Sequence, residues 1–100
     1  MKIIKIEPSE VQNKRYRVIL DDGKTYNFGL KNGNTYIDHH NLKLKDAYQK
    51  RHLGNKIEKD LIKNLIASPS LFSFYILWGP HTSIHQNIKY LNNLWAKKGL

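Results

Sequence analysis

The middle of the chain contains the side chains best suited to chemistry. His39 is followed nine positions later by Tyr48, and Arg51 and His52 come three and four positions after Tyr48. Imidazoles exchange protons near neutral pH, and a guanidinium binds phosphate or carboxylate with two parallel hydrogen bonds. Residues three and four apart on a helix are neighbours, so a helical segment here would bring the last three together. We interpret the set as a structural polar cluster that ties the loop before a helix to its last turn, and it consists of His39, Tyr48, Arg51 and His52.

A metal-dependent nuclease is the catalytic alternative for this stretch. Asp38 and His39 fall at an expected strand end, with Asn41 close behind and His52 at the end of the next helix, as in HNH-like enzymes. In such a site a metal ion polarises the phosphodiester while an imidazole takes a proton from water. The full pattern is not assembled, and no cysteine braces it. We therefore expect no catalytic residue, and we keep the nuclease as the less favoured alternative.

A second metal site would need His81 and His85, which are four positions apart. Thr82 is the expected cap of the last helix, so His81 lies outside that helix and the two imidazoles need not share a face. No HExxH glutamate accompanies them. We predict that the chain binds neither a metal nor another cofactor.

The strongest global signal is positive charge. Lys and Arg number 17 against 8 Asp and Glu, a net charge of +9, and no acidic residue follows Asp60. Lysines on helices are usually only a solvated surface. Basic residues interleaved with an aromatic one, as in Lys14-Arg15-Tyr16-Arg17, favour a polyanionic partner. Phosphate contacts of this kind do not read sequence. The residues predicted to bind nucleic acid are Lys14, Arg15, Arg17, Lys43, Lys50, Arg51, Lys63, Lys89, Lys97 and Lys98.

The length of 100 residues predicts one domain, 1–100, with a modest core. Alternating apolar residues predict strands over 2–7, 14–20 and 24–30, the last two joined by a tight turn at Gly23. In the second strand Tyr16, Val18 and Leu20 share one face, and Arg15 and Arg17 the other. Alternation continues to Tyr36. These strands form an antiparallel meander.

Helical spacing begins after Asn41, its expected N-cap, and stops at Gly54. A second amphipathic helix covers 57–66, and Ser68 with Pro69 begins a third whose run 71–78 is apolar enough to be buried. The last helix is predicted to start at Thr82. About four short helices packed on one face of the sheet make the fold α+β. Trp78 and Trp95 are interpreted as core or interface anchors.

The chain has no cysteine, and its longest apolar run, 71–78, is too short to cross a bilayer. Disulfides and thiolate zinc sites are therefore excluded. The charged N-terminus does not fit a secretory signal. We expect a soluble protein that stays inside the cell that makes it and has no membrane partner.

Several motifs resemble a family of small, basic, uncharacterised proteins encoded by nucleocytoplasmic large DNA viruses (giant viruses). These motifs are Lys14-x-x-x-Val18-x-Leu20-x-Asp22-Gly23-Lys24-x-x-x-Phe28-Gly29, Tyr36-x-x-His39, Tyr48-x-x-Arg51-His52, Ser68 and Leu77-Trp78. The resemblance runs from Lys14 to about Ile88. That family often has Lys-Asp where this chain has His40-Asn41, and a tryptophan within the segment that is here 71–74. The resemblance implies a viral protein of the host cytoplasm or the virion.

Charge and resemblance together predict a non-enzymatic protein that binds nucleic acid without sequence preference. A minor capsid or scaffold protein that binds other virion proteins is the alternative, and the nuclease is third. The sequence does not indicate whether the nucleic acid is DNA or RNA, and it does not indicate the oligomeric state.

Overall fold

The computed structural model describes all 100 residues and has the predicted α+β architecture. Its sheet is antiparallel, in the order β1-β2-β3. The predicted meander is confirmed, and its strands are β1 (Ile3–Pro8), β2 (Lys14–Leu20) and β3 (Thr25–Leu30). Pro8 closes the edge strand β1, where its missing N–H disrupts no central ladder.

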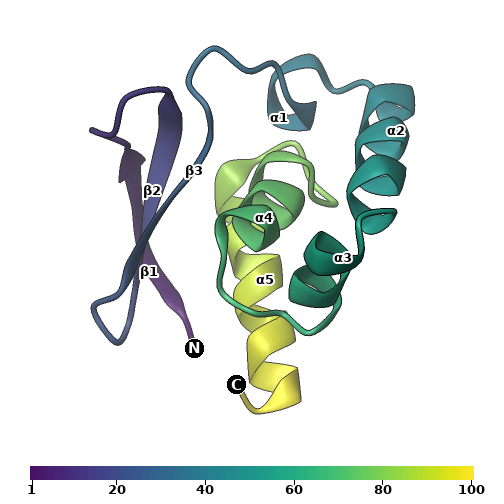
Figure 1. Ribbon diagram of the computed structural model, residues 1–100. Helices are drawn as coiled ribbons and strands as arrows, with labels where there is room; N and C mark the ends of the chain where they lie inside the picture. The colour runs from purple at the N-terminus through teal and green to yellow at the C-terminus, as the bar shows by residue number, and fades with distance from the viewer.

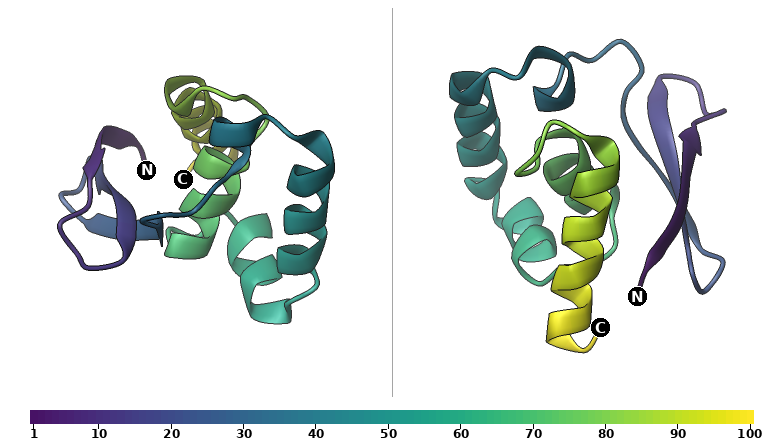
Figure 2. Two further views of the ribbon diagram at one scale, coloured as in Figure 1. Left: turned by 90° about the horizontal axis from the view of Figure 1, so that it is seen from above. Right: turned by 180° about the vertical axis from the view of Figure 1, so that it is seen from behind.

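One face of the sheet is covered and the other is open, as Figures 1 and 2 show. Val18, Leu20 and Phe28 point to the covered face and are almost completely buried. A β-bulge between Ile3 and Lys5 leaves Ile4 largely exposed while Ile3 enters the core. The period of two in β2 therefore determines which side of the sheet the helices cover.

The helical half wraps around one central segment. Helix α4 continues without a break into the π-helical turn η1, and the two lie between the sheet and the outer helices (Figure 1). Asn41 and Ser68 cap α2 and α4 as predicted, because their side-chain oxygens accept from first-turn amides. The elements are α1 (Tyr36–His39), α2 (Leu42–Leu53), α3 (Lys56–Lys63), α4 (Pro69–Phe72), η1 (Ser73–Leu77) and α5 (Ile84–Lys98).

Three predicted boundaries were wrong. The helix predicted over 57–66 ends at Lys63, and Leu65 beyond it has a positive φ of 54°. Tyr36–His39 forms the helical turn α1 rather than continuing a strand pattern, because the Thr35 amide donates to the Asp38 carboxylate at 2.8 Å in a capping box. Helix α5 is capped by Ser83 instead of Thr82. The fully buried side chain of Asn87 bonds both the N–H and the C=O of His81, which holds the chain before Ser83 in a non-helical conformation.

The core joins the covered face of the sheet to α4, η1 and α5. Leu71, Phe72 and Ile76 from the central segment, together with Leu91 and Trp95 of α5, have no exposed surface. The Trp95 indole N–H donates to the Leu65 carbonyl at 2.9 Å, so its one polar atom is satisfied inside the protein. Trp95 is therefore a core anchor, the first of the two roles predicted for it.

None of the helices combines the length and the apolar character that a bilayer crossing requires.

Candidate nucleic-acid interface

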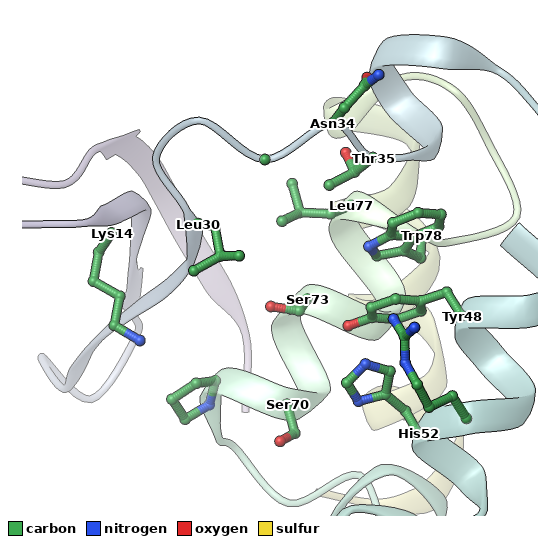
Figure 3. Close-up of a pocket in the computed structure, with 14 residues that line it drawn as sticks. Lys14, Leu30, Asn34, Thr35, Tyr48, His52, Ser70, Ser73, Leu77 and Trp78 are labelled. Atoms are coloured by element: carbon green, nitrogen blue, oxygen red, sulfur yellow. The ribbon is translucent and has the colours of Figure 1, made fainter. Parts of the chain in front are cut away.

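A groove of about 420 Å³ separates the edge of the sheet from α2. Figure 3 shows Lys14 and Leu30 on the strand side and Tyr48 and His52 on the opposite wall, with Ser73 on the floor between them. We call this feature the cationic groove. Segments far apart in the chain build it: β2 and β3, the loop after β3, α2, and the α4–η1 segment.

The lining of the cationic groove contains no carboxylate. Lys14 and Arg51 supply fixed positive charge, and His52 adds an imidazole. Neither Lys14 nor Arg51 forms an ion pair. Ser70 and Ser73 also line the groove and carry hydroxyl groups. Unpaired cations beside hydroxyl donors provide what an anion requires.

The floor of the groove is the π-helical turn η1. The Trp78 amide donates to the Ser73 carbonyl at 3.2 Å, the i to i+5 bond of a π-helix. Ser73, Leu77 and Trp78 all line the groove. A π-helical turn is rarer than an α-helical one and occurs frequently at functional sites.

The wall on the α2 side is an aromatic column. Trp78 stacks on Tyr48 with ring centroids 4.3 Å apart and planes 7° apart, and Tyr48 contacts the His52 ring at 4.0 Å. His39 packs against Trp78 at 5.3 Å. We call His39, Trp78, Tyr48 and His52 the aromatic column. Burial raises the pKa of Tyr48 to about 12, so its phenol is neutral at physiological pH.

The residues of the predicted polar cluster are held together by ring contacts and not by the hydrogen-bond network that we predicted. His39 and His52 are not tied to one another by hydrogen bonds, because Trp78 and Tyr48 lie between them in the column. His39 Nδ1 accepts from the Asn41 amide at 2.9 Å, and its Nε2 is buried without a partner. His52 Nδ1 bonds to the Glu58 carboxylate. Stacking, rather than a polar network, unites the group.

The two arginines of β2 are used inside the fold. Arg15 donates two hydrogen bonds to Asp38, at 2.7 and 2.6 Å, and Arg17 bonds to Glu7. The side-chain hydrogen bond to Asp38 raises the pKa of Arg15, and that to Glu7 raises the pKa of Arg17. Their guanidinium groups therefore hold protein carboxylates where we predicted phosphate. Lys50 likewise pairs with Asp46 at 3.0 Å.

The other predicted lysines do not gather on one patch. Lys43 is in the first turn of α2 and Lys89 is exposed on α5, two helices on different sides of the molecule (Figure 1). The Lys98 ammonium reaches the Lys63 carbonyl at 3.4 Å, so these two meet near the end of α5, where Lys97 also lies. Of the ten predicted residues, the cationic groove brings together Lys14 and Arg51.

The parts of the nuclease alternative do not converge. The Asp38 carboxylate is held by Arg15 and Thr35, and the Asn41 side chain caps α2. No three His, Asp or Glu side chains come together in a way that could hold a metal ion. His81 lies outside α5.

Sequence reasoning missed the hydroxyl and carboxylate neighbours of the groove. Ser70 and Ser73 line it, and Glu58 of α3 orients His52. The Ser68-Pro69 helix start places Ser70 in a first turn, but only the packing of α4 against α3 and β3 shows which face it occupies. Trp78, predicted as an anchor, is half-buried in the groove wall.

A model of a protein family described as "Family of unknown function (DUF5754)" matches residues 4–52. The match covers the sheet, α1 and nearly all of α2, and therefore includes Lys14, Tyr48, Arg51 and His52. Ser70, Ser73 and Trp78 lie beyond it. Neither a curated protein nor a solved structure matches the chain.

Proposed function

We propose that this protein is a non-enzymatic nucleic-acid-binding protein that holds a phosphate backbone in the cationic groove. One observation carries the proposal: Lys14 and Arg51 line a groove with no carboxylate in its lining. In a chain with a net charge of +9, binding draws on the whole positive field, and the groove supplies the place where phosphate is held.

Arg51 is the main phosphate contact. Its guanidinium lies over the Tyr48 ring, with the central carbon 5.9 Å from the ring centroid, and no carboxylate competes for it. A planar fork fixed in this way can donate two parallel hydrogen bonds to phosphate oxygens. Lys14 on the strand side contributes a point charge, and the seryl hydroxyls are further donors (Figure 3).

The lysines outside the groove contribute a sequence-independent attraction. Each phosphate that they neutralise releases condensed counterions, so affinity falls as salt is added. The absence of acidic residues after Asp60 keeps this field unopposed along α5. Such contacts position the strand and carry no sequence information.

A protein-binding role in a virion is the second candidate. Exposed apolar side chains support it, chiefly Ile57 at 74% and Leu42 at 66% exposure. The tryptophans do not support it, because Trp95 is fully buried and Trp78 is stacked in the groove wall. A viral origin and location in host cytoplasm or virion stay predictions from the resemblance.

Fluorescence anisotropy with labelled DNA and RNA at several salt concentrations tests the proposal. Arg51→Gln should weaken binding about tenfold at low salt and lower the salt slope by about one. Lys89→Gln removes the same charge from an exposed position on α5 and serves as the matched control, with an expected loss of under about threefold. Equal effects of both variants would contradict a role for the groove. No binding by the parent protein would contradict the function itself.

A further inference from the structure

We infer that the cationic groove accepts a single strand and rejects a duplex, holding the phosphate of a nucleotide at Arg51 and packing its base against Leu30. This inference rests on the proposed function and specifies its ligand. It follows from the size of the groove, from its two unlike walls, and from the aromatic faces that are already covered.

The size of the groove sets the first limit. A cleft of about 420 Å³ falls within the range of pockets that hold small organic ligands, roughly 300–1,000 Å³. A nucleotide is a ligand of this kind, and a single strand can place one in the cleft because its bases are not paired. A double helix keeps its bases inside and is far wider, so it can touch only the rim.

The two walls differ in chemistry. The α2 wall and the floor present Arg51 and the hydroxyls of Ser70 and Ser73, beside the His52 imidazole that Glu58 holds. On the strand side Leu30 is 71% exposed next to Lys14, although Phe28, two residues earlier in β3, is fully buried. A nucleotide has a matching division, with an anionic phosphate at one end and, at the other, a base whose flat faces can pack on an apolar side chain.

The aromatic column decides how the base is held. Trp78 stacks on the Tyr48 ring at 4.3 Å between centroids, and His52 and the Arg51 guanidinium lie against the same ring at 4.0 and 5.9 Å. A base therefore cannot stack on Tyr48 as it does on the exposed aromatic residues of many single-strand binders. Leu30 is the large apolar side chain that the groove leaves exposed, so base contact depends on it.

Three probes of equal length separate the contributions: oligothymidine, an abasic phosphodiester strand with the same charge, and a DNA duplex. Anisotropy at one moderate salt concentration should show oligothymidine binding at least about fivefold more tightly than either other probe. Leu30→Ser should reduce oligothymidine affinity to the abasic value and leave abasic binding unchanged. Leu42→Ser removes a leucine of similar exposure, 66%, on α2 outside the groove and should change neither.

Trp78 provides an independent readout of location. Trp78 lines the groove, whereas Trp95 is fully buried. Oligothymidine should therefore quench the tryptophan emission of the parent protein, and this quenching should be lost in Trp78→Phe. Equal binding of all three probes, or equal effects of the two leucine variants, would overturn this inference while leaving nucleic-acid binding intact. Failure of every probe to bind would instead overturn the proposed function.

Discussion

Tyr48 and Trp78 lie face to face, 4.3 Å between ring centroids, and this contact attaches α2 to the floor of the cationic groove. Helix α2 has no buried residue, so few contacts hold it in place. The Gln49 side chain adds a hydrogen bond to the Trp78 carbonyl at 3.1 Å. The width of the groove therefore depends in part on this stacked pair, whose members are 30 positions apart.

The stacked pair should show direct energetic coupling. In a double-mutant cycle, Tyr48→Leu and Trp78→Leu should each destabilise the protein, with a coupling free energy of about 1 kcal/mol, because either change removes the ring contact. Urea unfolding followed by circular dichroism measures it. Tyr90→Leu is the control, since Tyr90 is 40% exposed and its ring lies 6.2 Å from that of Tyr75. Additive effects would show that the stacking contributes nothing.

The Arg15–Asp38 pair should make stability sensitive to acid. Hydrogen bonds from Arg15, with help from Thr35, hold the pKa of Asp38 well below its usual range. At pH values between the folded and unfolded pKa, the carboxylate is ionised in the folded protein and protonated in the unfolded chain. The stability that the pair contributes is therefore fully present above about pH 4, and it is lost as the pH falls toward the folded pKa. Asp38→Asn should cost roughly 1–3 kcal/mol near neutral pH, and this difference from the parent should shrink on acidification.

Urea unfolding at a series of pH values measures that difference. Asp46→Asn is the matched control. It breaks an exposed ion pair with Lys50 one turn along α2, and its expected cost at neutral pH is under about 0.5 kcal/mol. A cost of Asp38→Asn that stayed constant down to about pH 3 would show that the pair does not cause the acid sensitivity.

Asn87 should be the most sensitive polar position of α5. Its buried side chain accepts from the His81 amide at 2.9 Å and donates to the carbonyls of Ile76 and His81 at 2.8 Å. Asn87→Ala would leave three backbone groups without their partner, at a cost of about 2–4 kcal/mol. Asn93→Ala on the exposed face of the same helix should cost under about 0.5 kcal/mol. Thermal unfolding of both variants makes the comparison, and similar melting temperatures would refute the assignment.

Gly79 should tolerate no side chain. A Cβ atom there would lie 1.9 Å from the Tyr75 carbonyl oxygen, which is backbone and cannot rotate away. Gly79→Ala should therefore destabilise by more than about 4 kcal/mol or prevent folding. Gly99 has a positive φ of +72° but open space around it, so Gly99→Ala should cost only about 1 kcal/mol. Circular dichroism spectra and melting curves of the two variants test this contrast. A Gly79→Ala variant as stable as the parent protein would contradict it.

Local patterns in the sequence were sufficient for most of the elements, although not for the short helix α1. The alternation in 14–20 predicted both the bounds of β2 and its buried face, because strand geometry places every second side chain on the same side. Asn41, Ser68 and Gly54 marked helix ends through short-range hydrogen bonds and backbone preferences. The α+β class followed from the order of these elements.

The site was only partly visible in the sequence. Tyr48, Arg51 and His52 were predicted to cluster because a helix makes neighbours of residues three and four apart, and they do line one wall of the groove. Ser70, Ser73 and Trp78 could not be assigned to the groove, because their position depends on how α4 packs against α3 and β3 and on the contact of Trp78 with α2.

Composition alone determined that the protein is strongly cationic, and local pattern determined where its strands and helices form. Tertiary structure decided which cations remain available. Arg15 and Arg17 are bound to carboxylates from other elements, whereas Arg51 opens onto a groove without any. Charge is additive along a sequence, but pairing depends on distances between distant segments, and only packing of the folded chain sets those distances.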